Sequence, residues 1–179
     1  IIEGKSKNIL RCERVLLNLM QHASGIASNV ASYKKVLEGY TLKLLDTRKT
    51  RPHLRIFEKY AIRCGGGSNH RMGLDDCLMI KDTHLKTIDN LQLFIEEARI
   101  KLPFTCKIEI ECEEIEFAKY AMQCGADIIM CDNMNCEQIA EVVTYAKRHF
   151  PHVLLEASGN ITKENIVEYA KTGVDAISS

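Results

Sequence analysis

The sequence KIEIECEEIEFAKYAMQCGADIIMC, residues 107–131, decides the fold. It opens with the alternating apolar residues of a β-strand and continues with the three- and four-residue apolar spacing of a helix. Gly125 ends that helix, and the apolar residues 128–131 then predict a second strand. A strand, a helix and a strand in this order form a parallel βαβ unit, because the helix carries the chain back to the start of the next strand.

The same alternation continues on both sides of this stretch. We expect further strands at 42–46, 77–81, 153–157 and 176–178, and helices at 54–64, 87–101, 136–149 and 163–171. Repeated βα units indicate parallel strands, and these fit either an incomplete α/β barrel or an open doubly wound sheet. Six strands with no glycine-rich dinucleotide loop after the first favour the barrel.

A helical segment precedes the barrel. Apolar residues between positions 8 and 37 recur with helical spacing, in one helix or in two joined near Gly25. We therefore expect residues 1–39 to be a helical remnant of an N-terminal α/β sandwich domain with its connection, and residues 40–179 to be the catalytic barrel. Because the chain starts without Met at Ile1 and stops at Ser179, directly after a strand, we expect a barrel truncated at its C-terminal end.

Composition excludes several classes of protein. The 179 residues carry 24 Lys and Arg against 24 Asp and Glu, so no overall field attracts nucleic acid or an anionic membrane. The apolar runs are far too short for a membrane span, and no signal peptide opens the chain, so we expect a cytoplasmic protein. The eight cysteines contain no C-x-x-C pair, which favours reduced, buried thiols over disulfides or a zinc site.

Polar residues follow the expected strands, where α/β barrels carry their chemistry. Glu109 and Glu111 alternate with apolar residues in strand 107–112, so one face of this strand is charged. A central strand of a parallel sheet buries both faces, and isolated buried carboxylates are costly. The alternative is an edge strand with a wetted face, which the position third of six disfavours.

Positive side chains follow the first two expected strands. Arg and Lys gathered at one rim suit a substrate with several carboxylate or phosphate groups, because guanidinium binds these oxyanions with two parallel hydrogen bonds. The alternative, a solvated basic face of helix 54–64, leaves the cations outside that helix unexplained. The residues concerned are Arg48, Lys49, Arg51, Arg55, His70, Arg71 and Lys81.

Two glycine-containing loops are candidates for phosphate binding. Gly65-Gly-Gly67 is a weak signal, because such clusters are more often flexible turns. Ser158-Gly159-Asn160 lies just before a helix expected near Thr162. Backbone N–H groups at a helix N-terminus bind phosphate, and late loops of phosphate-binding barrels commonly supply them.

Ordered motifs give the chain a family likeness. DTRKTRP at 46–52, GGGSNHRMGLD at 65–75, IKDTH at 80–84, GADIIMCDN at 125–133 and LEASGNI at 155–161 together resemble the quinolinate phosphoribosyltransferases over nearly the whole chain. Thr83 departs from the family, which usually has Asn there. The resemblance implies an incomplete α/β barrel after an open sandwich domain, in a homodimer or higher homo-oligomer with active sites between subunits. It also implies transfer of phosphoribosyl from phosphoribosyl pyrophosphate to quinolinate, with Mg²⁺, giving nicotinate mononucleotide, pyrophosphate and CO2 for NAD synthesis.

The resemblance also assigns roles to residues. The quinolinate carboxylates would be held by Arg48, His70, Arg71 and Lys81, with Thr47 beside them and with Arg14 reaching a neighbouring site across the dimer. Lys49 would meet the pyrophosphate, Glu111 and Asp132 the ribose hydroxyls or the metal, and Ser158, Gly159 and Asn160 the 5′-phosphate. The catalytic residues would be Lys49, Lys81, Glu111 and Asp132.

Three alternatives remain at this point. A relative that uses nicotinate needs to anchor only one carboxylate, so the surplus of cations disfavours it. An isomerase or synthase built on a phosphate-binding barrel explains the βα repeats and the loop 158–160 but leaves the basic rim unexplained. A non-catalytic binding domain is the third.

Overall fold

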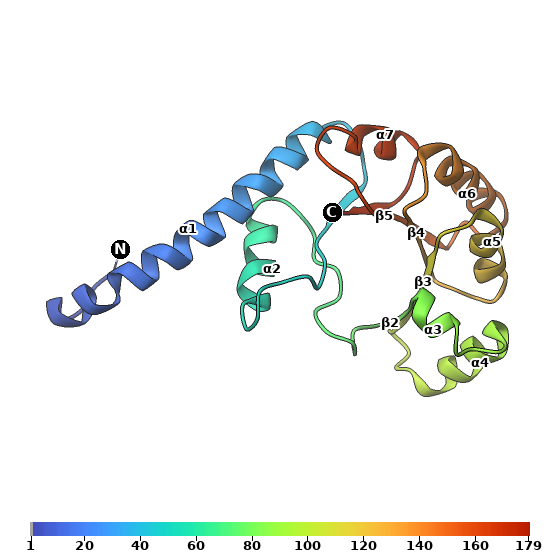
Figure 1. Cartoon of the computed structure of the whole chain (residues 1–179), viewed down its shortest axis with the longest axis horizontal. Helices are drawn as coiled ribbons and strands as arrows, with labels where there is room; N and C mark the ends of the chain where they lie inside the picture. Colours follow the sequence, from blue (N-terminus) through green and yellow to red (C-terminus); the bar gives the residue numbers. More distant parts are fainter. Residues whose placement is uncertain (1) are drawn as a thin grey trace.

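The fold is a six-stranded parallel sheet rolled into an open ring (Figure 1). The computed structural model describes residues 2–179. The strand order is β1-β6-β5-β4-β3-β2. The strands are β1 Lys43–Leu45, β2 Cys77–Ile80, β3 Lys107–Cys112, β4 Ile128–Asp132, β5 Leu154–Ser158 and β6 Ala176–Ser178. All neighbours pair in parallel, and β1 and β2 are the two edges of the sheet.

This strand order distinguishes a barrel from a doubly wound sheet. From β3 to β6 each strand lies beside the strand before it in sequence, and β6 then pairs with β1. A doubly wound sheet reverses direction at a switch point, and this sheet has none. The prediction of an incomplete α/β barrel is confirmed.

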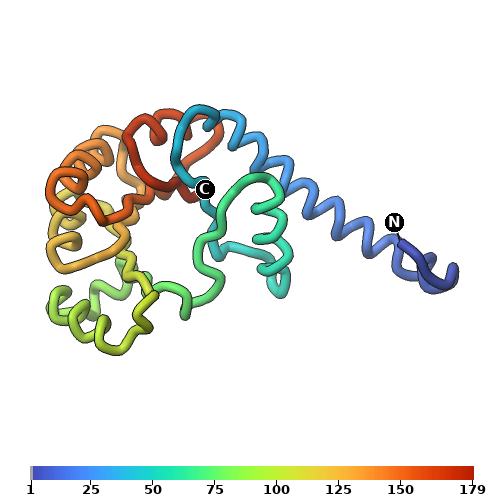
Figure 2. Tube along the Cα trace, turned by 180° about the vertical axis from the view of Figure 1, so that it is seen from behind, coloured from blue at the N-terminus to red at the C-terminus, as the bar shows by residue number. Residues whose placement is uncertain are grey.

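Helices cover the outside of the ring (Figures 1 and 2). Between strands and helices lies the apolar core, which includes Ile108, Ile110 and Ile129, all completely buried. The outer helices are α2 Arg55–Cys64, α3 Asp82–Leu85, α4 Leu91–Lys101, α5 Ile115–Gln123, α6 Cys136–His149 and α7 Ile166–Lys171.

The βαβ unit at 107–131 forms as its sequence predicts. Gly125 takes a positive φ of 96°, which ends α5 in a conformation that glycine adopts without strain. The Asp127 amide then donates to the Ile108 carbonyl at 2.8 Å, and the Asp127 carboxylate accepts from the Ile108 amide at 2.7 Å. These bonds fix the register in which Ile110 lies opposite Ile129.

Helix α1, Ser6–Val36, is one continuous helix that passes through Gly25 without a break. Its C-terminal part packs against α2, and its N-terminal part projects beyond the rest of the molecule (Figure 2). A Cβ on Gly65 would lie 2.5 Å from the Ala27 carbonyl oxygen, so glycine is required where the two helices meet. None of the helices within residues 2–179 combines the length and apolar character needed to cross a bilayer.

Several predicted boundaries are wrong. The helix expected at 87–101 begins only at Leu91, because the Asn90 side chain caps it by accepting from the Leu93 amide at 3.1 Å. The short helix α3 was not predicted, and α7 begins at Ile166, three residues later than expected.

The structure settles one alternative and corrects one expectation. Strand β3 lies between β2 and β4, so the edge-strand alternative is wrong, and Glu109 is fully buried inside the ring. Cys12 and Cys64 are exposed, although burial was expected for the cysteines in general. Five of the others are buried, and all eight are free thiols.

Replacing Ile129 by Ala should lower the free energy of unfolding by about 2–5 kcal/mol, because the cavity left in a fully buried site cannot collapse completely. Urea unfolding followed by circular dichroism measures the change. Ile100→Ala on α4 is the matched control, since Ile100 is 85% exposed and its loss should have little effect. Equal losses in both variants would contradict the assignment of the core.

Candidate active site

A cavity of about 310 Å³ opens at the C-terminal ends of the strands. It collects residues from the ends of β1, β2, β3, β4 and β5 and from the segment before β2. Most predicted site residues line it, namely Thr47, Arg48, Lys49, His70, Arg71, Lys81, Glu111, Asp132 and Ser158. Gly159 and Asn160 lie in the adjoining loop, and Arg14 lies exposed on α1, away from the cavity.

The cations crowd one side of this cavity. The pKa of Arg48 is lowered by desolvation and then by the neighbouring charges of Arg71 and Arg55. The Arg71 guanidinium is fixed by a 3.1 Å hydrogen bond to the Cys77 carbonyl at the start of β2. Like charges held this close favour an anionic ligand, because its binding relieves their repulsion.

Acidic side chains line the same cavity. Lys81, at the end of β2, makes an ion pair with Glu111 of β3. Asp132, at the end of β4, accepts from the Asn133 side chain at 2.8 Å. The sequence predicted both acids, and the parallel register brings them to the same rim.

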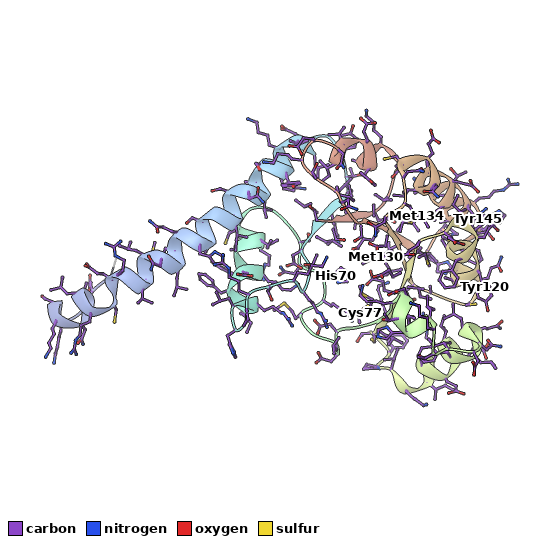
Figure 3. All side chains as sticks on the ribbon, in the orientation of Figure 1. His70, Cys77, Tyr120, Met130, Met134 and Tyr145 are labelled. Carbon is purple, nitrogen blue, oxygen red and sulfur yellow. The ribbon has the colours of Figure 1, made fainter. Side chains whose placement is uncertain are left out.

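A buried cluster joins His70 to two acids below the cavity. His70 Nε2 lies 3.2 Å from Glu109 and 3.3 Å from Glu156. These hydrogen bonds, first to Glu109 and then to Glu156, raise the pKa of His70 to about 10. The Arg71 amide contacts His70 Nδ1 at 2.7 Å and opposes a second proton, but two buried carboxylates outweigh one neutral amide. Figure 3 shows His70 inside the ring, whereas Tyr120 and Tyr145 lie on the outer helices.

Both ring nitrogens of His70 are therefore engaged within the protein. The predicted role of His70 as a direct carboxylate ligand stays a prediction, and a substrate would have to compete with these partners. Glu109 was noted in the sequence only as part of a charged strand face, and Glu156 was not singled out. The alternation in β3 was the signal for Glu109, and a lone acid within the apolar stretch 153–157 was the signal for Glu156.

The loop Ser158–Asn160 is shaped by its neighbour at the end of β4. Gly159 has a φ of 93°, and a Cβ there would lie 2.8 Å from the Asn133 backbone nitrogen. Asn160, also at positive φ, donates to the Asn133 side-chain oxygen at 3.1 Å. The expectation that this loop directly begins a helix is wrong, because α7 starts only at Ile166.

A second cavity of about 490 Å³ lies at the N-terminal ends of the strands. His70, Arg71 and Glu156 line both cavities, so the buried cluster forms the partition between them. Cys77 lines the second cavity, but burial raises the pKa of its thiol to about 12, so it is not a thiolate nucleophile at neutral pH.

The oxygen donors in the first cavity fit a magnesium ion in part. Mg²⁺ prefers carboxylate oxygens, water and substrate phosphates, and it usually takes only one or two protein carboxylates. Asp132 and Glu111 are donors of this kind, although Glu111 is already paired with Lys81. His70, Glu109 and Glu156 also place three possible ligand atoms within 4.8 Å, but Nε2 carries the proton that both acids bind, which opposes a metal there.

Comparison with known proteins supplies the family. The model of the quinolinate phosphoribosyl transferase C-terminal domain matches residues 26–179. The chain belongs to this family. A probable carboxylating nicotinate-nucleotide pyrophosphorylase from Synechocystis is 41% identical over 98% of the chain, and one from Methanothermobacter thermautotrophicus is 43% identical over 99%.

A solved structure of this family has the same fold. The crystal structure of NadC from Streptococcus pyogenes superimposes with a TM-score of 0.90 at 44% sequence identity and covers 98% of the chain. The chain spans 60% and 65% of the lengths of the two sequence relatives and 61% of the NadC chain.

The His70 cluster should make stability depend on pH. Because folding raises the pKa of His70 from about 6.5 to about 10, its contribution is complete below pH 6.5 and is lost as the pH rises toward 10. Urea unfolding across this range should show a decline that is shallower in Glu156→Gln, which lacks one of the two charges. The exposed Glu116→Gln on α5 is the control. Equal slopes in the wild type and Glu156→Gln would refute the cluster.

Proposed function

We propose that this chain is the catalytic barrel of an enzyme that transfers phosphoribosyl from phosphoribosyl pyrophosphate to quinolinate, with loss of CO2. The observation that carries the proposal is the shared cavity. Arg48, Arg71 and Lys81 come from three different segments, yet all three line it together with Glu111 and Asp132. Cations and acids in one cavity suit a dianionic pyridine beside a sugar. Membership of the family supports the same activity.

The charges match the steps of such a transfer. Phosphoribosyl transfer passes through an oxocarbenium-like state, which nearby carboxylates stabilise, and Lys49 would stabilise the departing pyrophosphate. Arg48, Arg71 and Lys81, by binding the two carboxylates, would hold the pyridine nitrogen in line with the anomeric carbon. Such orientation strongly lowers the activation barrier of the transfer. After transfer the ring is cationic, so it accepts the electron pair that decarboxylation leaves behind.

Mg²⁺ is the proposed cofactor. When bound it would neutralise charge on the pyrophosphate, and Asp132, with Glu111, is the protein carboxylate that would hold it. Ser158, Gly159 and Asn160 would bind the 5′-phosphate, because they border the cavity beyond the acids. The product, nicotinate mononucleotide, would serve NAD synthesis.

The assembly is part of the proposal as well. Arg14 lies outside the cavity on the projecting part of α1, so in a homodimer or higher homo-oligomer it would be available to a neighbouring subunit. A cytoplasmic location is the setting that this metabolism implies.

Nicotinate is the main alternative acceptor. It carries a single carboxylate, so the crowding of Arg48 and Arg71 beside Lys81 favours quinolinate. An isomerase or a non-catalytic binding domain does not need this basic rim.

Purified full-length protein, mixed with phosphoribosyl pyrophosphate and Mg²⁺, should consume quinolinate and release an equal amount of CO2. Removing the ion with EDTA should abolish turnover, because the charge on the pyrophosphate is then uncompensated. Absorbance of the pyridine and capture of labelled CO2 measure the two events. Turnover of nicotinate but not quinolinate would overturn the proposal.

Arg71→Ala and Lys81→Ala should each weaken quinolinate binding about tenfold or more, because each removes a charge-assisted hydrogen bond to a carboxylate. Calorimetric titration measures the affinities. Arg63→Ala and Lys86→Ala, exposed cations outside the cavity, are the matched controls. Unchanged quinolinate affinity in both test variants would contradict the assignment of the carboxylate site.

A further inference from the structure

Lys59 of α2 is a lysine buried almost completely. Only 1% of it is exposed, and its ammonium lies 2.5 Å from the carboxylate of Asp46, which is itself 5% exposed. Asp46 follows β1 directly, and Lys59 lies on the inner side of α2. The two charges neutralise each other, so neither is available to a ligand in the first cavity, which Asp46 lines.

The pair also binds the segment that carries His70 and Arg71. Asp46 Oδ1 accepts from the His70 amide at 2.9 Å, and Lys59 Nζ donates to the His70 carbonyl at 3.1 Å. Asp46 Oδ2 accepts from the Asn69 side chain at 2.6 Å, which in turn donates to the Lys59 carbonyl at 2.9 Å. Both backbone groups of His70 are thus held by one ion pair.

These hydrogen bonds take the place of strand pairing at the opening of the ring. Ser68 runs alongside β1, with its amide donating to Leu44 at 2.8 Å and its carbonyl accepting from the Asp46 amide at 3.2 Å. Among residues 2–179 the ladder stops there, at the opening of the ring between β1 and β2. Beyond Ser68 the segment is positioned by Asp46 and Lys59 until Arg71 bonds to Cys77 of β2.

An ion pair in this place is a poor source of stability. Taking two charges out of water costs about as much as their attraction returns, so apolar residues of similar size are often equally stabilising. What an apolar pair cannot supply is a set of directed hydrogen bonds to the His70 backbone. The main effect of the ion pair is therefore to position the His70 backbone rather than to stabilise the fold.

We propose that Lys59 and Asp46 are positioning residues that set the distance between Arg48 and Arg71, and so select a ligand with two adjacent carboxylates. Arg48 follows Asp46 by two residues, and Arg71 follows the clamped His70 by one. The two carboxylates of quinolinate have a fixed spacing, so both cations must be held at a fixed separation. The inference rests on the proposed function.

The test uses full-length protein with the double substitution Lys59→Met and Asp46→Asn, which leaves no unpaired buried charge. Thermal unfolding first establishes that the variant folds. Calorimetry then compares quinolinate with nicotinate, which has one carboxylate. We expect quinolinate affinity to fall about tenfold or more, the size of one lost charge-assisted bond, with nicotinate affinity little changed.

A general structural defect would weaken both ligands equally, and that result, or unchanged quinolinate affinity, would overturn the proposal. Asp46→Asn alone is a second variant that leaves the Lys59 ammonium buried without a counter-charge, so it should lower the melting temperature more than the double substitution does, and it should likewise weaken quinolinate binding more than nicotinate binding. Lys119→Met, which removes an ion-paired lysine on α5, far from this site, should change neither affinity. Failure of the wild type to bind quinolinate would instead refute the proposed function.

Discussion

Charges inside the ring of strands are tolerated only when they have partners, and this constraint shapes the site. Glu109 and Glu156 are buried within a parallel sheet, where an isolated carboxylate is costly, and both bond to His70. Asp46 is buried with Lys59 for the same reason. Asp46, His70 and Glu156 line the first cavity, so these pairs hold part of its lining in place.

Because the ring is open, side chains here make the positioning hydrogen bonds that paired strands make through their backbones in a closed barrel. Between β1 and β2 no ladder continues past Ser68 within residues 2–179, and the chain crosses this opening through Asn69, His70 and Arg71. Hydrogen bonds from Asp46 and Lys59 hold this crossing on one side, and a bond from Arg71 to β2 holds it on the other. His70 and Arg71, two of the residues proposed to bind quinolinate, therefore lie where the sheet constrains the chain least.

The two cavities of the barrel lie at opposite ends of the strands and share a partition. Both are lined by cations and acids, but the larger one is lined largely by the first residues of the strands. Size alone would favour the cavity at the N-terminal ends. The direction of the strands favours the cavity at their C-terminal ends, because parallel strands bring their exit loops to a single rim.

Reading along the chain predicted the alternation of strands and helices, favoured the parallel barrel over a doubly wound sheet, and revealed the family likeness and the cations at the strand exits. These are local or ordered features: apolar spacing, glycine stops and motifs such as Asp46-Thr-Arg-Lys49 are all read along the chain. Only the tertiary structure decided that Lys59 is buried against Asp46, and that His70 is bonded to Glu109 and Glu156. The physical reason is that such pairs join residues from different elements, and nothing in the local pattern of α2 distinguishes Lys59 from a solvated lysine.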